Sequence, residues 1–149
     1  MEKVDVLKTS PLFEMLSQPE LEVLAELSKL RRYAPGDIVF EEGDLGDSLY
    51  VIVSGQLEVV KRVEPSGERL LATLKDRDFF GEMSLVDKEY RSATVRARSD
   101  AQLLQLSAEN LIAFRRTYKD GFAFLLINIA RVLSGRLRET NQLLAQAPK

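Results

Sequence analysis

The sequence predicts an α+β protein, in which an antiparallel β-roll or jelly-roll barrel is flanked by N-terminal helices and a long C-terminal helix. Short apolar runs separated by Gly, Pro and Asp fill residues 31–107, a pattern typical of a β-sandwich or barrel. Apolar residues at helical spacing occur on both sides of this region, in 1–30 and in 108–146. A chain of 149 residues can bury one hydrophobic core, so we expect residues 1–149 to form a single domain.

The first 30 residues are expected to contain two helices. Ser10-Pro11 indicates a turn, and Pro19 suits the start of a second helix that is predicted to run to about Lys29. The apolar residues at helical spacing are Leu12, Phe13, Leu16, Leu21, Leu24 and Leu27. This spacing is typical of helices with one apolar face.

Seven or eight short strands are expected in the central region. Six of them are assigned to the runs 38–40, 49–53, 57–63, 69–74, 94–98 and 102–106. Because side chains alternate between the two faces of a strand, Leu57, Val59 and Val63 are predicted to share an inner face. The same alternation predicts a second inner face made by Ala93, Val95 and Ala97.

Helical spacing returns after Ser107, which is predicted to cap a helix that ends near Tyr118. Asp120-Gly121 is expected to separate this helix from a long one that runs from about Phe122 to Gln146. The long helix carries apolar residues at near-heptad spacing, namely Phe122, Leu126, Ile129, Leu133 and Leu137. This stripe fits either a homodimer interface or packing against the barrel.

The chain contains neither histidine nor cysteine. Cys/His zinc sites, His-ligated iron or copper, thiol nucleophiles, Ser-His-Asp triads and disulfides are therefore excluded. We expect no metal site and no enzymatic activity. The N-terminus lacks a signal-peptide pattern, and the longest apolar stretch, 122–130, is too short to span a bilayer. We therefore expect a cytoplasmic protein without a membrane segment.

The segment Phe80–Leu85, followed after five residues by Arg91–Val95, carries side chains suited to a sugar phosphate. Gly81 allows the backbone to approach a ligand, and the residues after it can begin a helix whose N–H groups attract an anion. The planar guanidinium of Arg91 matches two phosphate oxygens. Glu82 can accept a hydrogen bond from a sugar hydroxyl. Together these residues predict recognition of a sugar phosphate from both sides.

This segment resembles the phosphate-binding cassette of the cyclic nucleotide-binding domain family. A second family signature lies upstream, in Gly43–Gly55, and the two motifs occur in the family's order. The resemblance extends over about residues 8–145 and assigns the cassette to residues 80–95. It implies a sensor domain of the kind found in catabolite activator proteins, here without the DNA-binding domain that follows in many relatives. It also implies the β-roll predicted above.

The resemblance also implies roles for individual residues. Glu82 is expected to accept the ribose 2′-hydroxyl, and Arg91 is expected to hold the cyclic phosphate. The residues expected to complete the phosphate and ribose site are Gly81, Met83, Ser84, Ser92 and Ala93. The expected apolar wall consists of Val59, Leu71 and Leu74, and Arg136 is the expected cap over the base.

The ligand implied by the resemblance is a cyclic nucleotide, cAMP in preference to cGMP, and no other cofactor is expected. Two kinds of partner remain open: a second copy bound through the C-terminal helix, or an effector protein. Direct DNA binding is not expected, because the two C-terminal helices use nearly all residues after Ser107. The alternatives are a ligand-silent β-barrel that dimerises or docks a partner, and a cupin-like enzyme. The lack of histidine ligands argues against the enzyme.

Overall fold

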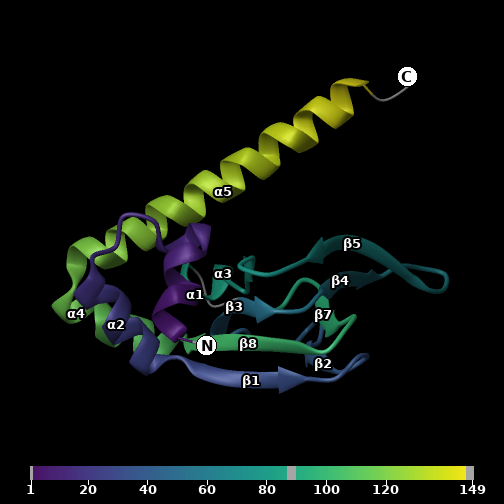
Figure 1. Ribbon diagram of the computed structural model, residues 1–149. Coiled ribbons are helices and arrows are strands. Elements are labelled where there is room, and N and C mark those ends of the chain that lie inside the picture. The colour runs from purple at the N-terminus through teal and green to yellow at the C-terminus, as the bar shows by residue number, and fades with distance from the viewer. Residues whose placement is uncertain (1, 87–89, 147–149) are drawn as a thin grey trace.

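Eight strands form the centre of the molecule, and the helices gather at one end of them (Figure 1). The computed structural model describes residues 2–86 and 90–146. The strands are β1 Lys29–Tyr33, β2 Ile38–Phe40, β3 Ser48–Ser54, β4 Leu57–Arg62, β5 Glu68–Leu74, β6 Phe79–Phe80, β7 Thr94–Ala97 and β8 Ala101–Ser107. They pair in the orders β1-β8-β3-β6 and β2-β7-β4-β5. The α+β class is confirmed, with two four-stranded antiparallel sheets that do not close into one barrel.

Strand β1 begins two residues before the predicted start of the β region. The predicted boundary at residues 30 and 31 is therefore wrong, as is a second helix that reaches Lys29. Ser28 already has an extended backbone, and Lys29 pairs with Gln105 of β8. Pairing along the whole of β1 outweighs the helical spacing of this segment. The two-residue strand β6 was also not predicted, since a run this short carries no periodicity.

The predicted alternation holds in β7 and in the first half of β4. Val95, Ala97 and Leu57 are buried in one core cluster, and Val59 packs against that cluster. Val63 lies beyond β4, which ends at Arg62. Strand β5 carries a β-bulge: Val59 pairs with Ala72 and Val60 pairs with Leu70, so Leu71 of β5 is the extra residue.

The N-terminal region consists of α1 (Lys3–Thr9), the 3₁₀ helix η1 (Pro11–Phe13) and α2 (Gln18–Leu27). A capping box stabilises the start of α2: the Ser17 N–H donates to Glu20 Oε1 at 2.8 Å, and the Glu20 N–H donates to Ser17 Oγ at 3.4 Å. Pro19 lies in the first turn, where a missing N–H costs nothing. The helix therefore begins where Pro19 indicates.

At the C-terminal side, the cap and the first helix are as predicted. The Asn110 N–H donates to Ser107 Oγ at 3.1 Å, and α4 runs over Ala108–Thr117. The predicted break at Asp120-Gly121 is wrong, because α5 spans Lys119–Gln146 and the joint is Tyr118. Gly121 instead lies against the Glu20 carboxylate of α2, where any Cβ would collide with it. This glycine serves close helix packing and does not end a helix.

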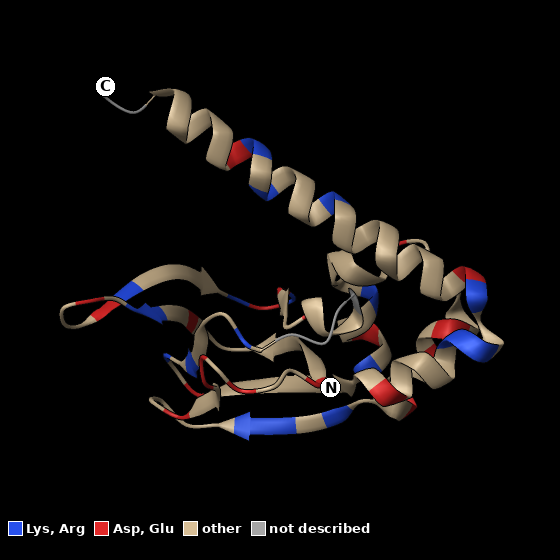
Figure 2. Ribbon diagram, turned by 180° about the vertical axis from the view of Figure 1, so that it is seen from behind, with Lys and Arg blue, Asp and Glu red and all other residues tan. Residues whose placement is uncertain are grey.

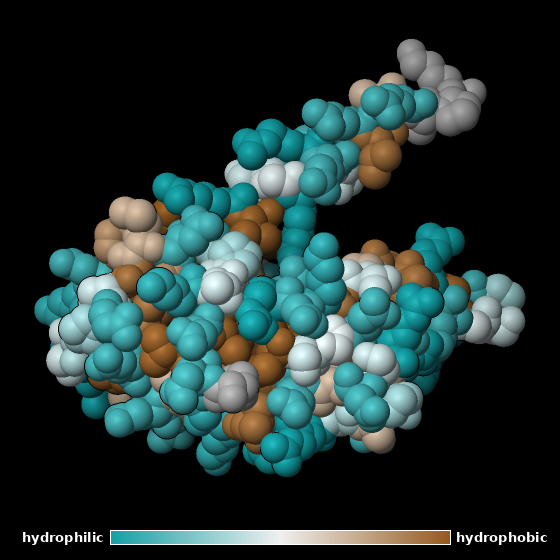
Figure 3. Space-filling view, in the orientation of Figure 1, coloured by the Kyte–Doolittle hydropathy of each residue, from teal (hydrophilic) through white to brown (hydrophobic). Residues whose placement is uncertain are grey.

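The long helix α5 has an inner part within the core and an outer part beyond it. The inner part contributes Phe122, Leu125 and Ile129 to the core. They lie in one cluster with apolar residues of α1, η1, α2 and the strands β3, β6 and β8. The outer part extends away from both sheets, and the space-filling view shows a hollow beneath it (Figures 1 and 3). The predicted stripe is thus divided, since Leu133 and Leu137 are exposed. No helix in the described ranges is long and apolar enough to cross a membrane.

Candidate functional site

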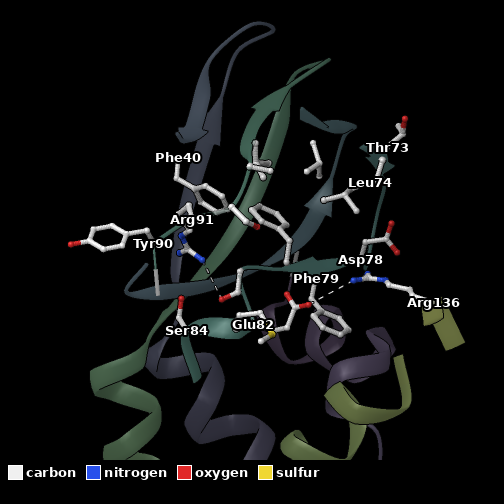
Figure 4. Close-up of a pocket in the computed structure, with 18 residues that line it drawn as sticks. Phe40, Thr73, Leu74, Asp78, Phe79, Glu82, Ser84, Tyr90, Arg91 and Arg136 are labelled. Atoms are coloured by element: carbon white, nitrogen blue, oxygen red, sulfur yellow. Dashed lines mark hydrogen bonds and ion pairs between the residues drawn. The ribbon is translucent and has the colours of Figure 1, made fainter. Parts of the chain in front are cut away.

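A cavity of about 490 Å³ opens between the second sheet, the segment after β6 and the outer part of α5 (Figure 4). Its volume lies in the range of small-molecule sites. Val59, Ala72 and Leu74 form an apolar wall on β4 and β5. Arg91 and Glu82 bring charged groups to the opposite side. The cavity therefore offers one surface for a flat apolar group and another for a polar, anionic one.

The backbone after β6 turns sharply into the short helix α3 (Met83–Val86). Gly81 makes this turn with a φ of 77°, a left-handed conformation that favours glycine. Space is a second reason for glycine: a Cβ here would lie 2.8 Å from the Ser48 carbonyl oxygen and 2.9 Å from Arg91 Nη1. The turn brings Glu82 and Ser84 to the cavity. Residues 87–89 of the expected cassette lie outside the described residues.

Arg91 is held by the backbone of two neighbouring segments. Its Nη2 donates to the Ser48 carbonyl at 2.6 Å and its Nη1 donates to the Gly81 carbonyl at 3.3 Å. The guanidinium carbon lies 4.0 Å from the centroid of the Phe40 ring. Burial lowers the pKa of Arg91 from its ordinary value, while Tyr50 and Asp47 act in the opposite direction. An arginine remains charged at neutral pH after such a shift.

Glu82 is buried, with 7% of its surface exposed, and faces α5. Its Oε1 lies 3.7 Å from Arg136 Nη1, and Figure 4 shows this ion pair at the mouth of the cavity. The Arg136 side chain is 51% exposed, so water screens the pair. A weak ion pair thus joins the cassette to the outer part of α5.

The structure brings nearly all of the predicted site residues to this one cavity. Its lining includes the residues Val59, Leu74, Gly81, Glu82, Met83, Ser84, Arg91, Ser92, Ala93 and Arg136. Leu71 is the exception, because the bulge in β5 leaves it 52% exposed and outside the lining. Its neighbours Ala72 and Thr73 line the cavity instead.

Outside the cassette, sequence reasoning missed the lining residues Phe40, Ala72, Thr73, Asp78 and Phe79. Strand alternation counted from Leu74 identifies Ala72, which lies two residues earlier in β5, whereas no spacing signal identifies Thr73. The aromatic Phe40 ends a predicted strand, but its contact with Arg91 joins residues far apart in the sequence. Basic residues are not confined to the cavity, since Lys119, Arg131 and Arg138 also lie along α5 (Figure 2). The part of the chain that is described holds no group of three acidic residues placed to bind a metal ion.

Comparison with known proteins agrees with this geometry. Residues 30–118 match the family described as the cyclic nucleotide-binding domain. The cyclic AMP receptor protein of Thermus thermophilus is 36% identical over 135 residues, which are 91% of this chain and 61% of that protein. The chain thus spans about three fifths or less of the length of the curated relatives it matches.

Two solved structures extend the comparison. A cyclic nucleotide-binding domain from Methylobacillus flagellatus superposes with a TM-score of 0.84 at 25% identity, over 99% of this chain and 84% of the other. The regulatory domain of Toxoplasma gondii PKA, crystallised with cAMP, has a TM-score of 0.70 at 27% identity, over 76% of this chain and 43% of the other. From the family match, the identity and the shared fold, we conclude that this chain belongs to the cyclic nucleotide-binding domain family.

Proposed function

We propose that the cavity binds cAMP and that binding is signalled through α5. The observation that carries the proposal is the arrangement of Arg91 and Glu82 on one side of a cavity whose other side is apolar. A cyclic nucleotide has a matching order of groups: a permanently charged phosphate, a ribose hydroxyl and a flat base. The names of the relatives favour cAMP, since they include a cyclic AMP receptor protein and a regulatory domain crystallised with cAMP.

In this proposal Arg91 holds the phosphate, because it carries a positive charge beside the cavity. Backbone N–H groups near Met83, Ser84 and Ala93 and the Ser92 hydroxyl add further donors. Glu82 accepts a hydrogen bond from the ribose 2′-hydroxyl, because a carboxylate is a good acceptor for a hydroxyl donor. The same carboxylate would repel the negatively charged phosphate. The base lies against Val59 and Leu74, which replaces the earlier assignment of Leu71, and Arg136 covers it.

The proposed signal passes through the ion pair between Glu82 and Arg136. A ribose hydroxyl that donates to Glu82 would compete with Arg136 for the same carboxylate. Beyond Val132, which packs against the core, the leucines of α5 are exposed: Leu133, Leu137, Leu143 and Leu144. A ligand can move a helix only by binding one of its positions more tightly than the other. We propose that the interaction of the ligand with Glu82 causes this difference in affinity between the two positions of α5.

Exposed apolar residues along α5 support a partner on this helix. Leu126, Leu133, Leu137 and Leu144 are 40%, 36%, 61% and 68% exposed, at spacings that keep them on one side of a helix. We propose that they pair with a second copy, with an effector protein as the alternative occupant. Sedimentation at micromolar concentration tests the pairing: we expect a dimer for the natural chain and a monomer for Leu133→Glu. A monomer for the natural chain, with and without cAMP, would contradict the homodimer.

Calorimetric titration with cAMP and with cGMP tests the proposed ligand. We expect saturable binding of cAMP with micromolar or tighter affinity and weaker binding of cGMP. Tighter binding of cGMP would correct the choice of nucleotide and keep the site. Failure of both nucleotides to bind would support the ligand-silent module, in which only α5 carries the function.

A further inference from the structure

We infer that Phe40 is a positioning residue for the phosphate site, and that it acts by holding the Arg91 guanidinium in place before any ligand binds. The inference rests on the proposed function, in which Arg91 receives the cyclic phosphate. Phe40 is the last residue of β2, 51 positions before Arg91 in the chain. Figure 4 shows the two side chains beside each other at the cassette end of the cavity.

The Phe40 ring covers one side of the guanidinium. The separation of 4.0 Å between the Arg91 Cζ and the ring centroid is well within the range of a cation–π contact. The ring is itself fixed by two other aromatic residues. Its centroid lies 6.0 Å from that of Tyr50 and 5.8 Å from that of Phe80, and Tyr50 and Phe80 stack at 5.1 Å. Arg91 therefore rests on a rigid aromatic surface.

Backbone encloses the rest of the guanidinium. A Cβ on Gly46 would lie 3.0 Å from Arg91 Cζ and Nε, and one on Gly81 would lie 2.9 Å from Arg91 Nη1. The carbonyls of Ser48 and Gly81 accept its hydrogen bonds. We call Phe40, Gly46, Gly81 and the Ser48 carbonyl the arginine socket. Every part of the socket is supplied by the chain itself.

This arrangement has a consequence for binding. An arginine side chain loses rotamer entropy when it is fixed in one conformation. The socket fixes Arg91 during folding, so a phosphate does not have to order it. Removing the Phe40 ring should leave the charge of Arg91 in place but reduce its preorganisation. Phe40 thus supports affinity through Arg91, without being required to touch the nucleotide.

The test compares cAMP affinity in Phe40→Leu, Phe40→Tyr and Phe114→Leu. Phe40→Leu keeps an apolar side chain but loses the aromatic face, and we expect binding to weaken about two- to thirtyfold. Phe40→Tyr keeps the face and should restore most of the affinity. Phe114→Leu is the matched control, because Phe114 is a buried aromatic residue of the helical core outside the cavity lining. It should reduce thermal stability without changing affinity by more than about twofold.

A double-mutant cycle with Arg91→Lys separates positioning from direct contact. Lysine retains the charge but not the planar group, so Phe40→Leu should have less than about twofold effect in the Arg91→Lys background. If Phe40→Leu weakens binding equally in both backgrounds, or no more than Phe114→Leu does in the natural background, the inference is wrong.

A measurement without ligand keeps this inference distinct from the proposed function. The aromatic ring should shift the Arg91 Nε–H proton resonance upfield in the ligand-free protein, and Phe40→Leu should abolish the shift. Loss of the shift in Phe40→Leu but not in Phe114→Leu supports the socket even if the natural chain binds no cyclic nucleotide. Absence of the shift from the natural chain would overturn the socket, whatever the ligand proves to be.

Discussion

Arg91 and Arg136 face the same cavity from opposite ends, and their surroundings differ. Arg91 is half-buried, donates to two backbone carbonyls and lies on the Phe40 ring. Arg136 is 51% exposed, makes one ion pair of 3.7 Å and lies on a part of α5 that leaves the core. The first arginine is built into the fold, whereas the second can change partners at little cost. Affinity should therefore depend mainly on the Arg91 end and the conformational response on the Arg136 end.

The largest expected effect is that of Arg91→Ala. It removes the charge that faces the phosphate, so we expect a loss of about 2–5 kcal/mol in binding free energy and no micromolar affinity for cAMP. Calorimetry measures the affinity, and thermal unfolding checks that the variant folds. Unchanged binding by a folded Arg91→Ala protein would show that the phosphate lies elsewhere.

Glu82→Ala should have the next largest effect. It removes the proposed acceptor of the ribose hydroxyl, at an expected cost of about 1.5–3 kcal/mol for a hydrogen bond to a charged group. Titration with 2′-deoxy-cAMP gives the control, because the natural chain should lose similar affinity for that ligand. If Glu82→Ala discriminates between the two nucleotides as strongly as the natural chain, Glu82 does not bind the hydroxyl.

Gly46→Ala tests the arginine socket by adding one methyl group next to the Arg91 guanidinium. The new Cβ would lie 2.8 Å from Ser84 Oγ and 3.0 Å from Arg91 Cζ, so the guanidinium must shift. We expect a loss of about 1–3 kcal/mol in cAMP binding free energy, comparable to overpacking in a core. Gly135→Ala is the matched control, since its added Cβ meets no atom within 4 Å. That variant should keep its affinity; equal losses in both would refute the steric explanation.

Arg136→Ala should change affinity least, by about 1 kcal/mol or less, because its ion pair is solvent-exposed. Its effect should appear in the motion of α5. The chain has no cysteine, so Gln142→Cys can carry a single dye on outer α5. We expect cAMP to change the anisotropy of this dye in the natural background and less so in Arg136→Ala. A large affinity loss with an unchanged dye response would reverse the roles given to the two arginines.

Features that depend on neighbouring residues can be predicted from local sequence patterns. Ser107 is a cap because its own side chain reaches the N–H three residues later. Val95 and Ala97 face inward because strand side chains alternate. Gly81, Glu82 and Arg91 lie in one short segment whose chemistry suits a sugar phosphate, and a family resemblance identifies that segment as a cassette. These interactions are short in sequence, and local patterns record them.

Features that depend on partners distant in sequence can be seen only in the folded chain. Leu71 is the extra residue of a bulge and lies outside the cavity lining, and Gly121 proved to be a packing site for Glu20. Distant contacts also divided the apolar stripe of α5, since its packing partners η1 and α4 lie against its inner part. The placement of Phe40 on Arg91 depends on several segments that are distant in sequence: β2, the start of β3, Gly46 and the turn at Gly81. Side-chain packing and strand pairing between distant segments determine such contacts. The spacing of residues within one segment therefore cannot predict them.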